Sequence, residues 1–357
     1  MRLKSWSFEQ PHQPMIWGER EEVAGATEVI VEVAGCGVCH TDLGFYYEGV
    51  PTRHPLPLTL GHEVSGQVVE AGDEAQRWLG RSVIVPAVMP CGSCEACLDG
   101  RQSICPRQIF PGNDVHGGFA THVRVPSLGL CTVPNLDCDQ INPLGLKLEM
   151  LSVLADAVST AYQAILRSPL EEAGLAIFVG AGGVGGFGVQ IAASRGARVI
   201  AIDTDAAKLD VMASHGADLT LCAKDMDFRQ IRGAVREYAH ALDIPTWRQC
   251  VFETSGTIHG QRTAFGLLAR GGYLSVVGYS PDKVSVRLAN LMALDATAQG
   301  NWGCVPEHYP AVLGLVLSGQ IKVEPFVEYR PLSTVNEVFV ALKQHAIQKR
   351  VVLVPDR

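Results

Sequence analysis

The stretch Leu175-Ala176-Ile177-Phe178-Val179-Gly180-Ala181-Gly182-Gly183-Val184-Gly185 decides the fold class of this chain. Its first five residues are apolar and predict a short buried strand, and the rest fits the pattern G-x-G-x-x-G. A helix is expected to follow over residues 188–194. Glycines in this context allow a tight turn and close backbone approach, and the helix N-terminus offers N–H groups to a pyrophosphate. The motif therefore predicts a dinucleotide site with contacts from Gly180, Gly182, Gly183, Val184 and Gly185.

Strands and helices alternate beyond this motif. Residues 198–202 read as a second strand and 206–215 as its helix, and later strands are expected at 250–253 and 273–277. This alternation predicts a doubly wound parallel sheet of the Rossmann type. Asp203 ends the second strand, where a carboxylate binds the adenosine ribose and repels the extra phosphate of NADP. We therefore predict NAD as cofactor, with Lys208 as a further contact; a plain glycine turn with a surface Asp is the alternative.

The chain before this region is rich in Gly, Pro and short β-type runs, such as residues 29–33, 64–69 and 82–86. Closely spaced turn residues predict a β-rich, barrel-like domain. A helical stretch is expected near 151–166, and a last strand at 351–354. We expect an α/β protein in which residues 1–156 and 302–357 form the β-rich domain and residues 157–301 the nucleotide-binding domain.

Four cysteines follow the pattern C-x2-C-x2-C-x7-C at Cys91, Cys94, Cys97 and Cys105. Thiolates this close in sequence can converge on one tetrahedral ion, and zinc is the usual one. A site closed by four sulfurs has no position for a substrate. We therefore predict a structural zinc.

The composition excludes several classes of protein. A net charge of −8 over 357 residues argues against a general nucleic-acid binder, which carries a basic surface. No signal-peptide core and no apolar run of about 18 residues is present, so we expect a cytoplasmic protein without a membrane span. The cysteines, 11 in number, are then thiols rather than disulfides. Those outside the sites are predicted to be packed thiols without chemistry: Cys36, Cys131, Cys138, Cys222, Cys250 and Cys304.

A second set of ligands lies upstream, in Cys39-His40-Thr41-Asp42 and Gly61-His62-Glu63. With the cysteine lobe and the glycine motif in this order, the chain resembles the zinc-containing alcohol dehydrogenases of the medium-chain dehydrogenase/reductase superfamily. The resemblance covers nearly the whole length. It implies a β-rich GroES-like catalytic domain beside a Rossmann domain, NAD as cofactor and two zinc ions per subunit. It also implies a homo-oligomer, a dimer or a tetramer.

The resemblance assigns roles at the catalytic zinc. Cys39 and His62 match two ligands, and Asp156 stands where many relatives have a third ligand, Cys. Asp156 as a helix N-cap is the alternative. Thr41 matches the hydroxyl that hydrogen-bonds the substrate oxygen, and Asp42 matches the carboxylate that orients the ligand histidine. The acidic residue that relatives sometimes use as an exchangeable ligand is Glu63.

The resemblance also extends the cofactor site. His40 is expected to point toward the cofactor phosphates, and Arg350 to pair with the pyrophosphate; an exposed surface charge is the alternative for Arg350. Val277, Gly278 and Asn301 fall where relatives lay backbone against the nicotinamide. Gly44 replaces the histidine that completes the proton path in many relatives, so the proton must leave by another route.

Two stretches bear on the substrate, Ile109–Phe119 and Lys147–Leu151. They resemble family members that oxidise a secondary ring alcohol carried as a CoA thioester. Arg53 and Lys147 are candidates for contacts to the CoA phosphates. Three alternatives remain: a dehydrogenase for small primary or secondary alcohols and aldehydes, a zinc-free reductase on the same scaffold, and a non-catalytic NAD-binding scaffold.

Overall fold

The computed structural model describes residues 1–356 and divides the chain into two compact units. The first unit comprises Met1–Ser159 together with the chain from Gly303 onward, and the second is Thr160–Trp302. The chain therefore leaves the first unit once and returns to it. Within residues 1–356, none of the helices combines the length and the hydrophobicity that a membrane-spanning segment requires.

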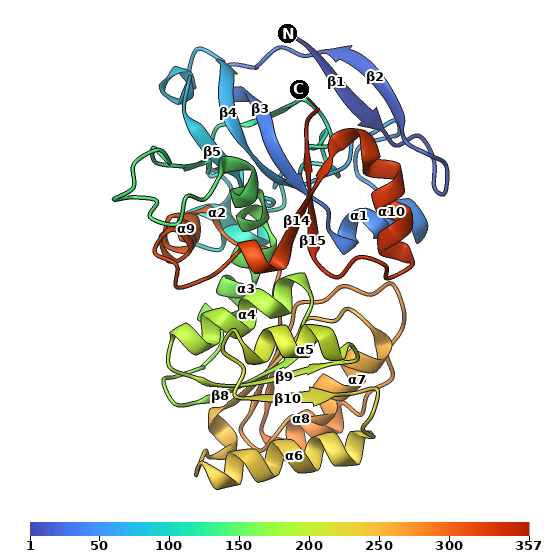
Figure 1. Ribbon diagram of the computed structural model, residues 1–357, viewed down its shortest axis with the longest axis vertical. Coiled ribbons are helices and arrows are strands. Elements are labelled where there is room, and N and C mark those ends of the chain that lie inside the picture. Colours follow the sequence, from blue (N-terminus) through green and yellow to red (C-terminus); the bar gives the residue numbers. More distant parts are fainter. Residues whose placement is uncertain (357) are drawn as a thin grey trace. The chain divides into compact units, whose positions relative to one another are not determined.

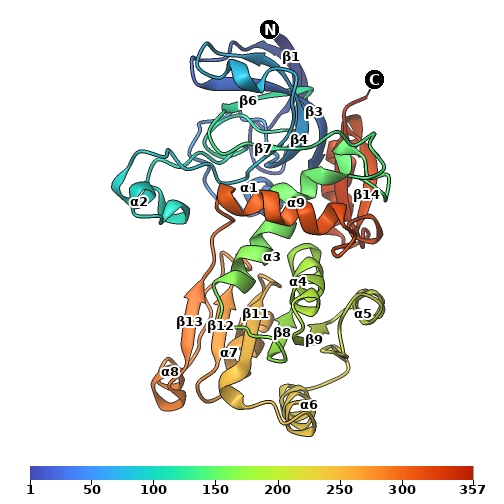
Figure 2. The same cartoon turned by 90° about the vertical axis from the view of Figure 1, so that its left-hand side faces the viewer.

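The first unit is built on a seven-stranded sheet, in which six strands have the order β14-β15-β3-β4-β5-β7 and the seventh, β6, pairs with β3 (Figure 1 and Figure 2). Its strands are β3 (Glu28–Gly37), β4 (Glu63–Ala71), β5 (Ser82–Val85), β6 (His122–Pro126), β7 (Cys131–Thr132), β14 (Val327–Pro331) and β15 (Arg350–Val354). A separate antiparallel pair is formed by β1 (Arg2–Ser7) and β2 (Ile16–Glu21). Alternating side chains of these strands, mainly Val, fill one apolar core. This unit agrees with the β-rich domain expected from the sequence.

The register of β3 against β4 places the metal-ligand motifs side by side. Cys36 lies opposite Val64 and Gly37 opposite Glu63, so the residues just beyond β3 reach those just before β4. A Cβ on Gly37 would collide with the Glu63 carboxylate, and only glycine fits at this point of the ladder. The antiparallel pairing therefore brings Cys39 and His62 together, although they are distant in sequence.

Helices of the first unit are short. They are α1 (His40–Tyr47), α2 (Glu95–Leu98), α9 (Tyr309–Leu317) and α10 (Val335–Lys343). The 3-10 helix η3 (Leu148–Ala155) packs on β3 and β4 and leads to Asp156. The other 3-10 turns of the chain are η1 (Gln76–Trp78), η2 (Gln102–Ile104), η4 (Thr246–Arg248), η5 (Pro306–His308), η6 (Glu324–Phe326) and η7 (Leu332–Thr334). The chain passes from the first unit to the second within α3 (Ala157–Leu166).

The second unit is a six-stranded sheet with the order β10-β9-β8-β11-β12-β13, and every pairing in it is parallel (Figure 2). Its strands are β8 (Leu175–Val179), β9 (Arg198–Asp203), β10 (Leu219–Cys222), β11 (Gln249–Glu253), β12 (Tyr273–Val276) and β13 (Thr297–Gly300). Its helices are α4 (Gly183–Ser194), α5 (Ala206–Ala213), α6 (Phe228–Ala241), α7 (Ile258–Gly266) and α8 (Ala289–Leu294). The predicted doubly wound parallel sheet is confirmed.

Both faces of this sheet are covered, as a parallel sheet requires. On one face Ile177 and Ile200 belong to a core that includes Ile231 and Val235 of α6. On the other face the ring of Phe178 packs so closely on α4 that a Cβ at Gly188 would collide with it. Glycine-rich α4 therefore lies tight against the sheet.

Two helical segments differ from the sequence-based expectation. The helix after the glycine motif begins at Gly183 rather than at residue 188, because the glycines themselves form its cap and first turn. The stretch near 151–166 is not one helix: a 3-10 segment ends at Ala155 and an α-helix starts at Ala157. The intervening Asp156 has the non-helical backbone angles φ −137° and ψ −65°. This break gives its side chain a direction that a continuous helix would not.

Candidate functional site

Four side chains of the first unit form a compact cluster of metal-ligand type. The ligand atoms of Cys39, His62, Glu63 and Asp156 all lie within 4.8 Å of one another. The Asp156 Oδ2 atom is 3.6 Å from His62 Nε2 and 3.7 Å from Cys39 Sγ. The structure thus brings together the three residues predicted to hold a catalytic zinc, with Glu63 as a fourth.

Asp42 ties the two ligand segments to each other. Its carboxylate accepts hydrogen bonds from Cys39 N–H at 2.9 Å and from Gly61 N–H at 3.1 Å. Asp42 lies in the first turn of α1, and Cys39 is the extended N-cap of that helix. The Asp42 Oδ1 atom, which accepts the bond from Gly61, also lies 3.4 Å from His62 Nδ1. Asp42 therefore lies next to the ring, and its role in orienting the imidazole, which the resemblance implies, stays a prediction.

The His62 imidazole lacks the partners that a buried ring requires. It is almost fully buried, yet neither ring nitrogen has a hydrogen-bond partner within the described chain. Burial alone would lower the pKa of this imidazole, but the negative charge of Asp42 and contacts with Asp156 and Cys39 raise it well above its ordinary value. A buried set of thiol, imidazole and carboxylates with excess negative charge fits a divalent cation, and zinc accepts this combination of ligands.

Glu63 and Arg350 form a buried ion pair at the edge of this cluster. Arg350 Nη2 lies 3.1 Å from Glu63 Oε1 and 3.7 Å from Cys39 Sγ, while Nη1 donates to the Val38 carbonyl at 3.2 Å. Burial raises the pKa of Glu63 to about 7, although the Arg350 charge opposes this. The arginine is therefore part of the cluster and not an exposed surface charge. Its predicted contact with the cofactor pyrophosphate stays a prediction.

Thr41 and His40 occupy the first turn of α1. Thr41 is half-buried, and its Oγ1 atom lies 3.7 Å from Cys39 Sγ, so the hydroxyl adjoins the cluster. His40 is the first residue of α1 and is exposed. The hydroxyl thus adjoins the cluster, while its contact with a substrate and the role of His40 stay predictions.

Phe110 belongs to the site, and no feature of the sequence assigns it this role. Its ring centroid lies 4.7 Å from that of His62, with 34° between the ring planes. The loop that carries it is anchored by Phe110 N–H, which donates to the Asp114 carboxylate at 2.9 Å. Phe110 is almost fully buried and covers one face of the ligand ring. An apolar residue before Pro-Gly carries no local signal for such stacking.

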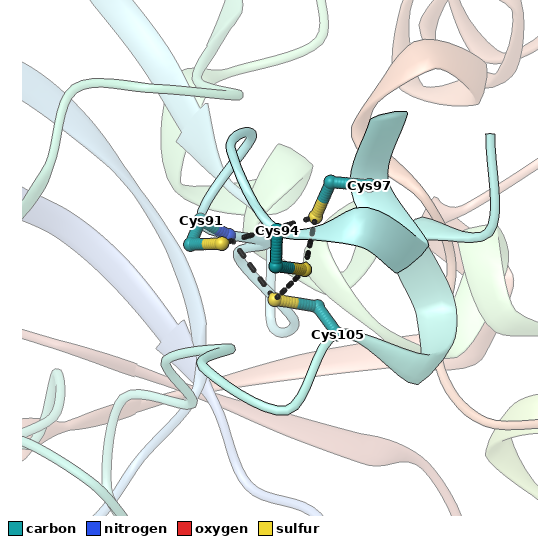
Figure 3. Close-up of side chains that lie close together, drawn as sticks. All are labelled: Cys91, Cys94, Cys97 and Cys105. Atoms are coloured by element: carbon teal, nitrogen blue, oxygen red, sulfur yellow. Dashed lines mark hydrogen bonds between the residues drawn. The ribbon is translucent and has the colours of Figure 1, made fainter. Parts of the chain in front are cut away.

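The four cysteines of the lobe converge around α2, as Figure 3 shows. The Cys94 sulfur lies 3.4 Å from that of Cys97 and 3.7 Å from that of Cys105, and the Cys91 and Cys97 sulfurs are 4.0 Å apart. Tetrahedral zinc with Zn–S bonds of about 2.3 Å requires sulfur–sulfur separations of about 3.8 Å. The geometry of the lobe therefore fits the predicted structural zinc.

The ionisation of this lobe supports the same assignment. The backbone N–H of Ser93 and other hydrogen bonds lower the pKa of Cys91 to about 5. Burial and the neighbouring sulfurs raise the pKa of Cys97 to about 12. The first thiolate forms readily, and its negative charge opposes ionisation of the neighbouring thiols. A bound cation is therefore needed for all four cysteines to ionise.

The glycine motif of the second unit has the geometry of a phosphate-binding turn. Gly180 has φ +104°, which favours glycine, and Gly182 is the N-cap of α4. A Cβ on Gly185 would collide with the Gly180 carbonyl, so this position keeps the turn closed. A Cβ on Gly182 would meet nothing within 4 Å, and this side of the turn is open to a ligand. Gly183 is exposed and Val184 half-buried in the first turn of the helix.

Asp203 closes the next strand beside this turn. Its Oδ2 accepts from Ala181 N–H at 2.7 Å and its Oδ1 from Asp205 N–H at 3.0 Å. These bonds fix the carboxylate at the carboxyl end of β9, and each oxygen keeps a second lone pair for a ribose hydroxyl. Lys208 lies half-buried in α5, which follows directly.

The other predicted cofactor contacts lie in the same unit. Val277 and Gly278 follow β12, and both backbone N–H groups donate to the Glu253 carbonyl at 2.9 Å. Asn301 follows β13, and its side chain bonds Gln163 and the Thr160 carbonyl, both at 3.3 Å. All three residues therefore lie at carboxyl ends of parallel strands, where ligands of open α/β sheets bind.

Comparisons with known proteins define the class. The sequence model of the alcohol dehydrogenase GroES-like domain matches residues 25–135, and that of the zinc-binding dehydrogenases matches residues 183–318. Together the two matches cover more than half of the chain. The chain is an oxidoreductase that acts on CH–OH groups and belongs to the zinc-dependent alcohol dehydrogenases of the medium-chain dehydrogenase/reductase superfamily.

The individual relatives are distant in sequence but match more than nine tenths of the chain. An alcohol dehydrogenase of Geobacillus stearothermophilus is 28% identical over 331 residues, which cover 92% of each chain. An L-threonine 3-dehydrogenase of Bacillus licheniformis is 28% identical and covers 92% of this chain and 91% of its own. The solved alcohol dehydrogenase of the archaeon Aeropyrum pernix matches with a TM-score of 0.85 and 26% identity, over 99% of this chain and 100% of its own. Family, zinc and nicotinamide cofactor thus agree with the sequence-based prediction.

Proposed function

We propose that this dehydrogenase binds its catalytic zinc through Cys39, His62 and Asp156 and its structural zinc through the four-cysteine lobe. The observation that carries this assignment is the buried His62 ring, whose nitrogens have no hydrogen-bond partner within the described chain while Cys39 and Asp156 face it. When bound, the zinc supplies a Lewis acid with one open position, and NAD accepts a hydride. A non-catalytic scaffold would have no need for this set of ligands.

The protein's own side chains have distinct tasks in this proposal. Asp42 holds the Cys39 and Gly61 backbones and orients His62. Thr41 presents a hydroxyl beside Cys39, where it can hydrogen-bond the substrate oxygen and relay its proton, receiving it while passing its own hydroxyl proton on toward solvent. Phe110 covers His62 and keeps water from that side. Glu63, paired with Arg350, is the candidate exchangeable ligand, since its Oε2 has no hydrogen-bond partner within the described residues.

For the substrate, we propose the secondary ring alcohol of 6-hydroxycyclohex-1-ene-1-carbonyl-CoA, oxidised to the conjugated 6-oxo thioester of anaerobic benzoyl-CoA breakdown. The support is the resemblance of residues 109–119 and 147–151 to 6-hydroxycyclohex-1-ene-1-carbonyl-CoA dehydrogenase. Both stretches adjoin the proposed metal site: the first carries Phe110, and the second begins the segment that ends at Asp156. A dehydrogenase for small primary or secondary alcohols and aldehydes is the second candidate, and the alcohol dehydrogenases among the relatives favour it.

The two surface cations named for CoA differ in their surroundings. Arg53 is exposed but paired with Asp114 at 3.2 Å, so part of its charge is already neutralised. Lys147 is exposed at the start of η3. We therefore expect Lys147→Glu to raise KM for the CoA ester more than Arg53→Glu does, with little change for an alcohol that lacks phosphates.

Steady-state kinetics with the zinc-loaded enzyme and NAD test the substrate. We expect kcat/KM for the CoA ester to exceed that for 2-cyclohexen-1-ol and for ethanol by more than tenfold. The pantetheine thioester, which has the same ring without the nucleotide, separates recognition of the ring from recognition of CoA. A preference for 2-cyclohexen-1-ol or ethanol over the CoA ester would reject the ring thioester in favour of the second candidate. A cytoplasmic location and a dimer or tetramer stay predictions from the sequence.

A further inference from the structure

The backbone carbonyl of Ala155, directly before Asp156, is held by two segments that are distant in sequence. The phenolic hydroxyl of Tyr309 donates to it at 2.5 Å, and Ala87 N–H donates to it at 3.1 Å. Ala155 is fully buried and Tyr309 is 1% exposed. Both lone pairs of this carbonyl are therefore used, one of them by a side chain of α9.

The hydrogen bonds from Tyr309 and Ala87 hold the backbone directly before a residue that no helix or strand fixes. Asp156 lies between the end of η3 and the start of α3, and its backbone is not helical. A third bond acts on Asp156 itself, because Ser159 Oγ donates to its carbonyl at 3.3 Å. Burial raises the pKa of Tyr309 well above its ordinary value, so the phenol stays a proton donor. The direction of the Asp156 side chain thus depends on a few hydrogen bonds from outside its own segment.

The position of Ala87 extends this arrangement to the cysteine lobe. Ala87 follows β5 and precedes Cys91 by four residues. The Ala155 carbonyl consequently joins three parts of the first unit: the segment of the proposed third ligand, the segment entering the four-cysteine lobe, and α9. The hydrogen bond from Ala87 is donated by a backbone N–H group, so no side-chain substitution removes it. The hydrogen bond from Tyr309 is donated by a side-chain hydroxyl, and substitution by Phe removes that one oxygen atom.

We propose that Tyr309 is a positioning residue for the catalytic metal: its hydroxyl fixes the backbone before Asp156 so that the carboxylate faces Cys39 and His62. This inference rests on the ligand set of the proposed function. The alternative is that Tyr309 only fills the core with its ring. The positioning role depends on the hydrogen bond from the hydroxyl, whereas the packing role depends on the ring alone.

Zinc affinity of the folded enzyme, measured by chelator competition, tests the proposal. Tyr309→Phe keeps the ring and the Ala87 bond to Ala155, so the fold should persist. We expect the affinity of the catalytic site to fall about tenfold, the lower end of the effect of removing a group that orients a metal ligand. The zinc of the four-cysteine lobe should stay bound. With cobalt in the catalytic site, the visible absorption bands should shift, since a reoriented carboxylate changes the ligand geometry.

Tyr273→Phe is the matched control. Tyr273 is also buried, and its hydroxyl donates to Gln299 at 2.7 Å, but it lies in the second unit. It should lose some stability and no metal affinity. An equal loss of metal affinity in Tyr273→Phe would show general loosening and overturn the proposal.

Asp156→Asn separates the failure of this inference from that of the proposed function. If Asp156→Asn loses the catalytic metal while Tyr309→Phe keeps normal affinity and an unchanged cobalt spectrum, the positioning role is wrong and the ligand set stands. If Asp156→Asn retains both metals at normal affinity, the ligand set is wrong, and the role of Tyr309 falls with it.

Discussion

Arg350 and Glu63 form an ion pair in which the side chains are 6% and 0% exposed, with 3.1 Å between Nη2 and Oε1. The pair is incompletely satisfied, because Arg350 Nε and Glu63 Oε2 have no hydrogen-bond partner within the described chain. Desolvation of two charges costs several kcal/mol, and a pair of this quality seldom repays it. Its position next to Cys39 therefore indicates a role in balancing charge at the metal cluster rather than in stability.

Removing only the arginine should destabilise the metal-free protein strongly. Arg350→Met leaves the Glu63 carboxylate buried beside Asp42 and Asp156, and breaking such a pair costs about 3–5 kcal/mol in the free energy of unfolding. The double variant Glu63→Gln/Arg350→Met removes both charges and should recover most of this loss. Urea unfolding of the metal-free variants measures both values.

An exposed ion pair provides the control for this comparison. Arg198 and Asp218 lie 3.0 Å apart with side chains 52% and 28% exposed. Arg198→Met should cost less than about 1 kcal/mol, as surface pairs do. If Arg350→Met lowers the free energy of unfolding no more than Arg198→Met does, Arg350 does not compensate the buried charge of Glu63, and its role in charge balance at the metal cluster is wrong.

Cofactor preference should depend on Asp203. Its carboxylate is fixed by Ala181 and Asp205 at the end of β9, where it would bind ribose hydroxyls and repel a phosphate. Asp203→Asn removes the charge, so the ratio of kcat/KM for NAD over NADP should fall by about 10- to 100-fold, the value of hydrogen bonds to a charged group. Initial rates with each cofactor measure this ratio.

Asp218→Asn is the matched control for this change. Asp218 also lies in the second unit and also accepts a backbone hydrogen bond, from Val199 N–H at 2.8 Å. Its neutralisation should leave the preference between the cofactors unchanged. An unaltered preference in Asp203→Asn as well would remove this residue from the cofactor site.

The sequence predicts those parts of the molecule that depend on local pattern. The strand, glycine turn and helix around Gly180 follow from apolar periodicity, and the cysteine lobe follows from close spacing. The contact between Cys39 and His62 follows from motifs, but its geometry depends on the β3–β4 register, which no short pattern encodes. The stacking of Phe110 on His62 and the bond from Tyr309 to Ala155 arise from packing between distant segments. Arg350 shows the same limit, because its motif position predicts a contact with the cofactor but not its ion pair with Glu63.

Thr41 should be required for turnover but not for cofactor binding. Its hydroxyl lies 3.7 Å from the Cys39 sulfur, and we propose that it relays the substrate proton, receiving it while passing its own hydroxyl proton on. Thr41→Ala should lower kcat on the order of 100-fold, the lower range for loss of a proton-transfer group, while the Kd for NAD stays unchanged. Thr41→Ser keeps the hydroxyl and should retain most of the activity. Near-normal turnover in Thr41→Ala would exclude the residue from proton transfer.

His116 should make the first unit less stable in acid. Burial, together with the charges of Arg20, His54 and Arg124, lowers the pKa of His116 to about 4. In the unfolded chain a histidine has a pKa of about 6.5. Between these values the unfolded chain binds a proton that the folded protein does not, so stability falls as the pH drops from about 6.5 to about 4.

One substitution tests both the size of this loss of stability in acid and its origin in His116. His116 Nδ1 accepts from Thr59 N–H at 3.1 Å, and the amide oxygen of Asn can replace this acceptor without titrating. Solvent reaches part of the ring, so His116→Asn should abolish on the order of 1–2 kcal/mol of the stability lost between pH 7 and pH 4. Urea unfolding at several pH values measures this difference. His259→Asn, at an exposed position of α7, should leave the pH profile unchanged. If both variants keep the wild-type profile, the acid sensitivity of the fold has another origin than His116.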